Sequence, residues 1–416
     1  MAFGNISFLA LIIVLLSFPG CGGSDNGSSH KEPIHVNEMQ IGALIPLTGA
    51  YGNHGTQILA ALNCAIEDIN KIFGNDNKDT RIKLVYADTK TDPAKAKAEI
   101  KSFISRDIRM IIGPLTSGEV IGVKDEIDLS NSLLISPSST LTSLSTADDN
   151  IYRIVPDDEK TVEATVDVMW EQGIRNVALF YVDNAWGQSF GSLLREKFEA
   201  KGGTYIGEVS YIGTRGSELR EYLGELSELI NNSKTLNVDA SNVAVQLISL
   251  DVGCFILELA AADTTLSKVK WFGCDGLVNT DELFLFPEGA KFANEVEFTS
   301  PIFGTPPTFE SQKLINRIRL LAGSTPNEYS LLTYDALMVA AQTLEKAGED
   351  ATLSELRETL LATFNHYSGI TGDIVLNNAG DRSNGSYFFW RVMPDGDAYQ
   401  WDHVITYTDG IITDVK

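Results

Sequence analysis

The sequence is short of basic residues, of cysteine and of long hydrophobic runs. Its 416 residues include 32 Lys and Arg against 56 Asp and Glu, which gives a formal net charge of −24. This deficit of positive charge argues against nucleic-acid partners and against electrostatic binding to anionic lipid, because both require a basic surface. Hydrophobic residues make up 44% and charged residues 21%, which excludes a disordered chain. The length is too great for one compact core and predicts two lobes or domains.

Cysteine is too scarce to suggest a metal site. The four cysteines are Cys21, Cys64, Cys254 and Cys274, and no two of them form a CxxC pair. Zinc sites usually draw two ligands from such a pair, so no metal site is expected. The sequence also contains no HExxH motif, which removes the commonest signature of a metalloprotease.

One hydrophobic run stands at the start of the chain, and it is short. Phe8–Leu16 is a run of nine apolar residues, whereas a helix needs about 20 to cross a bilayer. The run is typical of a signal peptide, predicted over 1–20, although the first ten residues contain no Lys or Arg. Gly20 stands directly before Cys21, as lipoprotein processing requires, and 21–36 is predicted to be a lipid-anchor cysteine with a flexible tether. The alternative is an ordinary cleaved signal followed by an incidental cysteine. Lipid at Cys21 would be the only membrane attachment of a protein held in the periplasm or cell envelope.

From about residue 38, short apolar runs alternate with amphipathic stretches. Alternation of this kind predicts an α/β fold with parallel sheets covered by helices on both faces. The predicted strands are 41–45, 82–86, 110–112, 133–135, 177–182, 205–209, 243–250 and 269–272. Residues 308–364 are predicted to be mostly helical, and 373–407 to form short strands with turns. The strands fall into two similar series, so we expect two Rossmann-like lobes with ligand-binding loops at their carboxyl ends.

Three loops of the first series lack basic residues. The glycines in 46–55 follow a GxxGxxG spacing and not GxGxxG, and 113–118 lacks the Lys of a phosphate-binding loop, so no nucleotide cofactor is expected. Neutral donors that suit a carboxylate are Thr116, Ser117, Ser138, Ser139 and Thr140. The alternative is that these hydroxyls only cap the following helices, and both roles are compatible because a capped helix N-terminus also attracts anions.

The second series supplies an aromatic and two acidic candidates. Trp186 follows the strand 177–182 and could stack on a ligand, or could pack beneath its own loop. Asp251 and Asp275 each follow a strand and could hold an ammonium group, or could serve as turn or capping residues. Neutral donors on one lobe and a carboxylate on the other would suit a free amino acid.

The chain resembles the type I periplasmic solute-binding proteins of ABC transporters, in particular the branched-chain (Leu/Ile/Val) amino-acid branch. The stretches that carry the resemblance, in order along the chain, are 41–49, 112–117, 135–140, 181–187, 271–276, 334–336 and 371–373. The resemblance implies that Thr116, Ser117 and Thr140 bind a ligand carboxylate, and that the Ser138 carbonyl and Asp275 bind its ammonium group. It also implies that Trp186 and Tyr51 are aromatic contacts.

The same resemblance implies two lobes joined by three hinge strands. The expected boundaries are 37–157 plus 300–366 for lobe 1 and 158–299 plus 367–416 for lobe 2. The implied function is not enzymatic: a monomer captures an amino acid by closing its lobes and delivers it to an ABC permease. A receptor of the same fold that senses an amide, urea or small organic acid is the alternative. A disulfide between Cys254 and Cys274 is sterically possible, because both residues follow neighbouring strands.

One enzyme motif needs an explanation. Residues 187–191 match GxSxG, the nucleophile elbow of α/β-hydrolases, with Ser189 as the nucleophile. In that motif the serine stands directly at the strand end, whereas six residues intervene between Val182 and Ser189 here. His366 and His403 lie downstream without a supporting acid–histidine spacing, so the hydrolase reading is the remote alternative.

Overall fold

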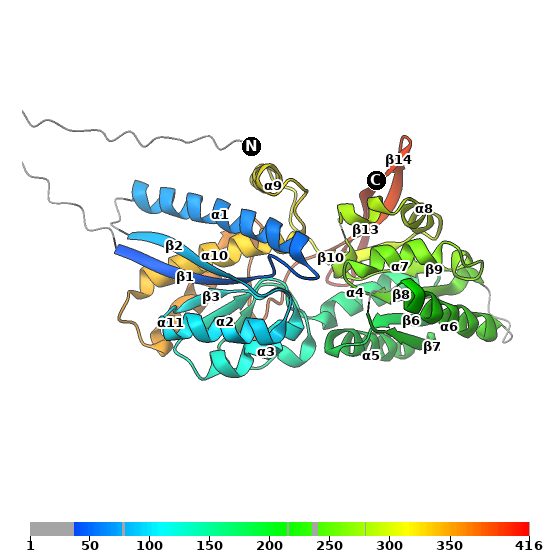
Figure 1. The fold of residues 1–416 in the computed structure, drawn as a ribbon, viewed down its shortest axis with the longest axis horizontal. Helices are drawn as coiled ribbons and strands as arrows, with labels where there is room; N and C mark the ends of the chain where they lie inside the picture. Colours follow the sequence, from blue (N-terminus) through cyan, green and yellow to red (C-terminus); the bar gives the residue numbers. More distant parts are fainter. Residues whose placement is uncertain (1–36, 77–79, 214–215, 235–239, 279, 416) are drawn as a thin grey trace, which may run out of the picture. The chain divides into compact units, whose positions relative to one another are not determined.

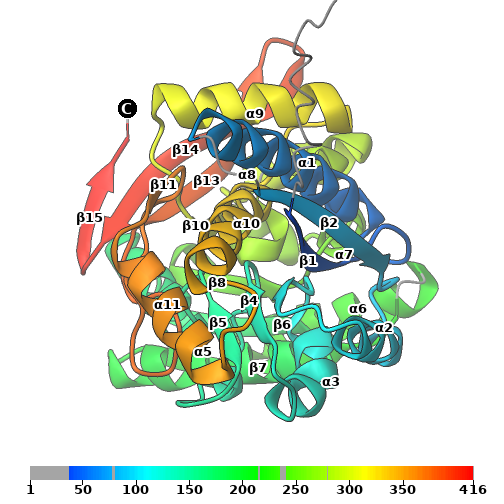
Figure 2. The same ribbon diagram turned by 90° about the vertical axis from the view of Figure 1, so that its left-hand side faces the viewer.

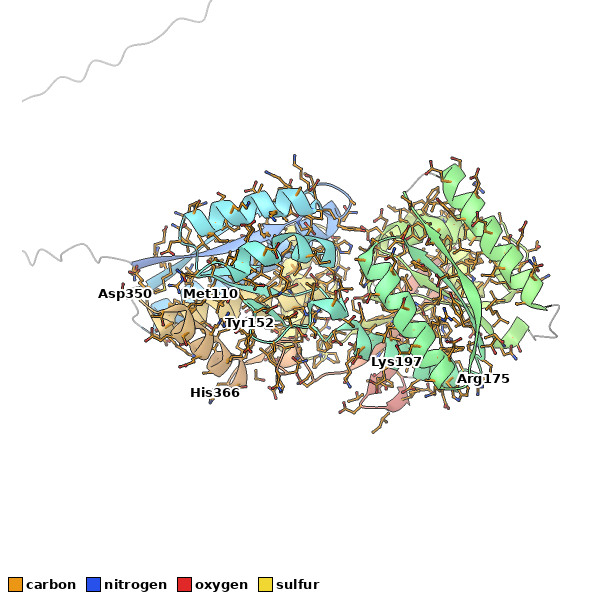
Figure 3. The ribbon with its side chains drawn as sticks, turned by 90° about the horizontal axis from the view of Figure 1, so that it is seen from below. Met110, Tyr152, Arg175, Lys197, Asp350 and His366 are labelled. Atoms are coloured by element: carbon orange, nitrogen blue, oxygen red, sulfur yellow. The ribbon has the colours of Figure 1, made fainter. Side chains whose placement is uncertain are left out.

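Figure 1 shows the computed structural model, which describes residues 37–76, 80–213, 216–234, 240–278 and 280–415. The predicted signal peptide, Cys21 and the tether lie outside these residues. The remainder of the chain forms two α/β lobes, each built on its own sheet. Met110 and Tyr152 lie in the first lobe and Arg175 and Lys197 in the second (Figure 3).

The first lobe contains a five-stranded parallel sheet with the order β2-β1-β3-β4-β5. Its strands are β1 (Asn37–Ile45), β2 (Thr80–Asp88), β3 (Met110–Ile112), β4 (Leu133–Ser136) and β5 (Ile151–Arg153). Its helices are α1 (Gly52–Asn75), α2 (Pro93–Ser105), α3 (Ser117–Asp128), α9 (Phe309–Ala322), α10 (Glu328–Ala347) and α11 (Leu353–Asn365). Helices α1, α9 and α10 group together on one side of this sheet (Figure 2).

Strand β1 explains why the first sheet reads as continuous apolar runs. Successive side chains of a strand point to opposite faces. Ala43 and Ile45 therefore enter the core beneath α1 and α10, while Leu44 enters the core beneath α2 and α3. Both faces are buried, as expected of a parallel sheet.

The second lobe has an eight-stranded sheet that is mixed and not purely parallel, with the order β15-β14-β13-β10-β9-β8-β6-β7. The strands are β6 (Asn176–Val182), β7 (Thr204–Tyr211), β8 (Val243–Ile248), β9 (Lys270–Phe272), β10 (Thr299–Phe303), β13 (Tyr387–Asp395), β14 (Ala398–Thr408) and β15 (Ile411–Asp414). The helices are α4 (Asp158–Glu171), α5 (Ala185–Ala200), α6 (Gly216–Lys234), α7 (Val252–Ala260) and α8 (Pro287–Glu295). The parallel prediction fails for the C-terminal strands of this sheet. Tight turns join β13 to β14 and β14 to β15, which requires antiparallel pairing, and β13 also runs antiparallel to β10.

The chain crosses between the lobes three times, after β5, after β10 and before β13. The last two crossings run side by side, since the Gly304 amide donates to the Ser386 carbonyl over 2.8 Å. Residues 368–384 differ from the predicted boundary at 367, because they pack on the first lobe. Both oxygens of the Asp335 carboxylate on α10 accept hydrogen bonds from Thr371 or its neighbours, and Arg153 on β5 binds Asp381.

The predicted disulfide between Cys254 and Cys274 is wrong. Both residues are buried free thiols, as is Cys64. The Cys274 thiol donates instead to the Ser249 carbonyl over 3.2 Å, and Cys254 packs into the core of the second lobe from the first turn of α7. Burial raises the pKa of both thiols, which keeps them protonated.

Candidate functional site

A cavity of about 390 Å³ lies between the two lobes at the carboxyl ends of their strands. Its lining comes from the segments that follow β1, β2, β3, β4, β6, β8 and β9, together with the start of α10. The lining residues are Ala50, Tyr51, His54, Thr91, Pro93, Leu115, Thr116, Ser117, Gly118, Ser138, Thr140, Asn184, Ala185, Trp186, Leu250, Asp275, Gly276 and Tyr329. The volume suits a small organic molecule and is too small for a macromolecular ligand.

The N-terminus of α3 faces this cavity. Thr116 caps the helix: its Oγ1 accepts from the Glu119 amide, and its hydroxyl donates to Glu119 Oε2 over 2.7 Å. The Thr116 side chain is therefore occupied within the helix. The amides of Ser117 and Gly118 are the first-turn donors that no helical carbonyl can reach, and both residues line the cavity. This end of the helix can bind a carboxylate through backbone N–H groups and its dipole.

The loop after β4 is held by hydrogen bonds that leave one hydroxyl available. The Ser139 hydroxyl donates to Ser117 Oγ over 3.0 Å, so the Ser117 hydroxyl keeps its own proton for a ligand. Ser138 points its hydroxyl at the Leu115 carbonyl, 2.6 Å away, while Ser138 and Thr140 both line the cavity. Ser139 does not line it and acts as support.

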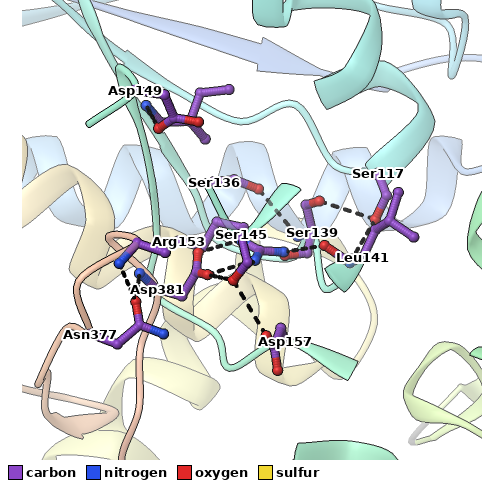
Figure 4. Close-up of polar contacts among 12 residues, drawn as sticks. Ser117, Ser136, Ser139, Leu141, Ser145, Asp149, Arg153, Asp157, Asn377 and Asp381 are labelled. Carbon is purple, nitrogen blue, oxygen red and sulfur yellow. Dashed lines mark hydrogen bonds and ion pairs between the residues drawn. The ribbon is translucent and has the colours of Figure 1, made fainter. Parts of the chain in front are cut away.

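A buried ion pair between Arg153 and Asp381 holds this loop in place (Figure 4). The Arg153 guanidinium binds the Asp381 carboxylate with Nε–Oδ1 and Nη2–Oδ2 distances of 2.5 and 2.7 Å. Its Nη1 donates to the carbonyls of Ser139 and Leu141 over 3.2 and 2.8 Å. The bidentate geometry and complete burial make this pair a rigid brace for the 138–141 loop.

Asp275 brings the negative charge from the second lobe. It begins a short 3₁₀ turn directly after β9, and its Oδ1 accepts from the Gly276 amide over 3.1 Å. Its Oδ2 accepts a hydrogen bond from the Tyr329 hydroxyl at the start of α10, so the two lobes meet at this carboxylate. Burial raises the pKa of Asp275, and the hydrogen bond from Tyr329 opposes that rise.

Two aromatic side chains complete the walls. Trp186 lies in the first turn of α5 and packs edge-on against Phe190, with ring centroids 6.2 Å apart, while part of it lines the cavity. Tyr51 stands at the N-cap position of α1, and burial raises the pKa of its phenol. Together they offer apolar surface to a ligand side chain.

Asp251 does not line the cavity, but it contacts His54, which does. Its carboxylate accepts a hydrogen bond from His54 Nε2 over 2.9 Å, and Asn327 Nδ2 donates to the other ring nitrogen of His54 over 2.6 Å. His54 and Asn327 belong to the first lobe and Asp251 to the second. Asp251 therefore joins the lobes and does not touch the space where a ligand would lie.

The structure brings most of the predicted residues to one cavity and separates two. Those that line it are Tyr51, Thr116, Ser117, Ser138, Thr140, Trp186 and Asp275. Ser139 and Asp251 do not. Tyr329 and His54 were not predicted. His54 stands in the glycine-rich loop that the sequence marks, but Tyr329 follows an ordinary helix N-cap and only the return of the chain to the first lobe brings it to Asp275.

Ser189 has none of the geometry of a nucleophile elbow. It lies inside α5, not at the end of β6, and its hydroxyl pairs with the Thr142 hydroxyl at 3.2 Å. His366 ends α11 in the first lobe (Figure 3), and His403 pairs with groups of its own strand. The glycine before Ser189 has a packing role, because a Cβ on Gly187 would lie 2.1 Å from the Val182 carbonyl oxygen.

The described residues contain neither a membrane-spanning helix nor a cluster of metal-binding side chains. Over 37–415, leaving out the short gaps, no helix is both long and apolar enough to cross a membrane. Nor does any group of three or more His, Cys, Asp or Glu side chains in that part of the chain come close enough together to hold a metal ion.

Known proteins share both the sequence pattern and the fold. A family model described as periplasmic binding protein matches residues 38–397. A Leu/Ile/Val-binding protein of Rhizobium johnstonii is 25% identical over 366 residues, which cover 86% of this chain and 93% of the relative.

Solved structures match across the same region. A branched-chain amino acid transporter substrate-binding protein from Streptococcus pneumoniae, in complex with isoleucine, superposes with a TM-score of 0.71 at 17% identity and covers 88% of this chain and 100% of its own. A solute-binding protein from R. palustris, in complex with benzoate, gives a TM-score of 0.70 at 17% identity over 88% of this chain and 96% of its own. The chain belongs to the periplasmic binding protein family, with the type I fold of extracytoplasmic proteins that bind amino acids or other small organic ligands.

Proposed function

We propose that this protein captures a free amino acid, branched-chain or related, between its lobes and delivers it to an ABC permease. The observation that carries the proposal is Asp275, a buried carboxylate in the cavity opposite the N-terminus of α3. One face can hold an ammonium group and the other a carboxylate, which are the two charges that every free amino acid carries.

The division of the ligand contacts between the two lobes explains why a ligand would close them. A ligand shifts an open–closed equilibrium only by its difference in affinity for the two states. An amino acid that touches Ser117 on one lobe and Asp275 on the other completes both sets of contacts only in the closed state. The three segments that cross between the lobes, after β5, after β10 and before β13, are the places where rotation would occur.

A second candidate ligand is an aromatic or aliphatic carboxylate without an amine, since a neighbour of this fold holds benzoate. The carboxylate-binding end of α3 would serve such a ligand equally well. It would leave Asp275 buried without a cationic partner, which is why we favour the amino acid.

A thermal-shift screen of the twenty amino acids, with benzoate and 4-methylpentanoate as amine-free controls, tests the proposal. A ligand at about 100 times its Kd stabilises the folded state by about 2.7 kcal/mol, so at least one amino acid is expected to raise the melting temperature. In the Asp275→Asn variant the same amino acid should bind at least tenfold more weakly, because its ammonium group loses a charged partner. Stabilisation by the amine-free acids alone would contradict the proposal.

We also propose that the protein is a monomeric lipoprotein, attached to the cell envelope through Cys21. The small residue before Cys21 and the polar segment behind it support this. Mass spectrometry of protein purified from membranes should find an N-terminal diacylglyceryl cysteine, and the Cys21→Ala variant should appear in the soluble fraction. An unmodified Cys21 or an N-terminus beyond it would reject the anchor.

A further inference from the structure

A second cavity, of about 500 Å³, lies beside the segment that crosses between the lobes after β10. It shares no lining residue with the ligand cavity at the strand ends, although the two approach each other at the start of α10. There Tyr329 lines the ligand cavity and Glu328 lines the second one. The volume falls within the range of about 300–1,000 Å³ that is typical of small-molecule sites. We call this second space the hinge cavity.

The floor of the hinge cavity is an aromatic surface on the C-terminal hairpin of the second lobe. Phe388 and Trp390 alternate on β13, and Trp401 and His403 alternate on β14, so each pair points to one face of the sheet. All four line the cavity. The His403 ring stacks on Phe388 with centroids 4.3 Å apart and lies 5.4 Å from Trp390. Trp401 is held by a hydrogen bond from its Nε1 to the Thr280 carbonyl over 3.1 Å, so the floor is preorganised.

The roof of the hinge cavity belongs to the first lobe. Gln312 and Arg319 lie two turns apart on α9 and both line the cavity. Arg319 forms no ion pair with the residues that the structure describes, and its Nη1 donates to Asn316 Oδ1 over a long distance of 3.4 Å. At one end of the cavity the Glu328 carboxyl accepts a hydrogen bond from the Thr305 hydroxyl. A ligand in the hinge cavity therefore contacts both lobes.

The charges around the hinge cavity favour an uncharged ligand. The titratable groups among its lining residues are Asp281 and His403 from the second lobe and Arg319 and Glu328 from the first. Burial raises the pKa of Glu328 to about 7 and lowers the pKa of His403, so near neutral pH neither group carries a full charge. The charges of Asp281 and Arg319 cancel. A simple anion would meet the Asp281 carboxylate and a simple cation the Arg319 guanidinium, and each like charge opposes binding.

Neutral hydrogen-bonding groups supply the rest of the polar lining. Gln312 and Gln400 each carry an amide that both donates and accepts. Gln400 Nε2 donates to Asp402 Oδ1 over 2.9 Å, which leaves its Oε1 as an acceptor. A sugar ring has matching chemistry, because one face presents C–H groups to an aromatic surface and the hydroxyls at its edge both donate and accept.

We propose that the hinge cavity is a second ligand site, which binds an uncharged sugar of one or two rings stacked on the aromatic floor. The hydroxyls of the sugar bond to Gln312 and Arg319 on the roof and to Asp281 and Gln400 on the opposite lobe. The site goes beyond the proposed function, since it uses no residue of the ligand cavity and does not depend on what that cavity binds.

Saturation-transfer NMR of the full chain tests the proposal with D-glucose, D-galactose, D-mannose, N-acetyl-D-glucosamine, maltose and cellobiose. At least one of these sugars should receive saturation at millimolar concentration, most strongly at the C–H protons of one ring face. D-glucosamine and D-glucuronate are the matched charged ligands and should bind more weakly than D-glucose. Absence of binding by every uncharged sugar would overturn the proposal.

Variants of the floor and the roof locate the binding. Trp390→Leu should raise the Kd of the bound sugar by about threefold to tenfold, because it removes an aromatic face. Trp170→Leu is the matched control, since it changes another half-buried tryptophan of the second lobe that lies outside the cavity, and its Kd should equal that of the wild type. Should Trp390→Leu fail to fold, Gln312→Ala at an exposed position of α9 should still raise the Kd by about threefold. Wild-type affinity in both Trp390→Leu and Gln312→Ala would reject the site.

Two further results would contradict the proposal in different ways. If Asp275→Asn abolishes sugar binding and Trp390→Leu does not, the sugar occupies the ligand cavity and the hinge site is wrong. If no uncharged sugar binds but L-phenylalanine binds and Trp390→Leu weakens it, the hinge cavity takes a zwitterion and the sugar assignment is wrong. The thermal-shift screen of amino acids together with Asp275→Asn tests the ligand cavity alone, so either proposal can fail while the other stands.

Discussion

At the residue scale, neighbouring hydroxyls in one loop have different roles. Thr116 and Ser117 are adjacent and both belong to the predicted carboxylate site. The Thr116 hydroxyl donates to the Glu119 side chain, as the helix-capping alternative predicted. The Ser117 hydroxyl instead accepts a hydrogen bond from Ser139, so its own proton remains available to a ligand. A sequence places both at a helix start, but only the hydrogen-bond partners show which hydroxyl remains available.

The contact between His54 and Asp251 yields a prediction about closure. The pair joins the lobes beside the cavity, and both side chains are largely buried, 15% and 12% exposed. The contact joins the two lobes, so we expect it to break when they open. Asp251→Ala should therefore raise the Kd for the amino-acid ligand by about threefold to tenfold, the value of one hydrogen bond. His54→Ala should have a similar effect, and the double variant should be no weaker than either single variant.

Calorimetric titration of the three variants measures this coupling. Glu282 provides the control. It also contacts the other lobe, but its hydrogen bond from Asn53 is long, at 3.5 Å, and exposed to solvent. Glu282→Ala should leave the Kd within twofold of the wild-type value, as expected for an exposed contact (about 0–1 kcal/mol). Additive losses in the His54 and Asp251 double variant would show that the two residues act separately.

At the element scale, the sequence predicted the positions of strands and helices better than it predicted which elements and side chains pair with one another. Apolar runs such as 110–112 and 133–135 predicted β3 and β4 because both faces of these strands are buried. The Cys254–Cys274 disulfide was inferred from adjacent strands, but Cys254 lies in the first turn of α7 and packs into the core of the second lobe. The C-terminal strands were predicted as short strands with turns, but their antiparallel pairing in the second sheet was not predicted, because a strand pattern does not encode direction.

The Arg153–Asp381 ion pair joins strand β5 to the segment around Asp381 and supports the 138–141 loop. Breaking this pair should lower the free energy of unfolding. Asp381→Ala leaves the Arg153 guanidinium buried without a charged partner, and breaking a buried pair in this way costs about 3–5 kcal/mol. Urea unfolding should show this loss in the free energy of unfolding. The control is Glu38→Ala, which breaks the exposed pair with Lys83 (2.8 Å) and should cost less than about 1 kcal/mol. Equal losses in the two variants would mean that Asp381 is not a brace.

At the scale of the whole molecule, the order of the lobes could be anticipated only through the resemblance. Local patterns cannot show that α9, α10 and α11 return to the first lobe after β10, because the contacts involved are distant in sequence. Tyr329 was missed for this reason, because it meets Asp275 only when the chain has returned to the first lobe. The residue types at the strand ends were enough to locate the site. Which side chains of one lobe meet the Asp275 carboxylate of the other depends on how the chain crosses between the lobes.

Glu328 links the hinge to the body of the first lobe and should make the stability of the protein depend on pH. It begins α10, is buried, and accepts a hydrogen bond from Thr305 in the segment that crosses after β10. Burial raises its pKa from 4.5 to about 7. In the folded state the carboxyl keeps its proton up to about pH 7, whereas the unfolded chain loses it near pH 4.5. Its contribution therefore favours the folded state below pH 4.5 and is lost as the pH rises to about 7, at roughly 1.4 kcal/mol per pH unit.

The Glu328→Gln variant should remove this dependence, because its neutral amide keeps an oxygen acceptor for Thr305 and cannot ionise. Relative to wild type, the variant should be little changed at pH 5 and more stable by about 2–3 kcal/mol at pH 8, measured by urea unfolding at both values. Glu355→Gln is the matched control, since it changes an exposed glutamate at the start of α11 and alters no buried charge. A constant difference between Glu328→Gln and wild type from pH 5 to pH 8 would mean that Glu328 does not titrate in this range, because the buried carboxyl alone supplies the pH-dependent part of the difference.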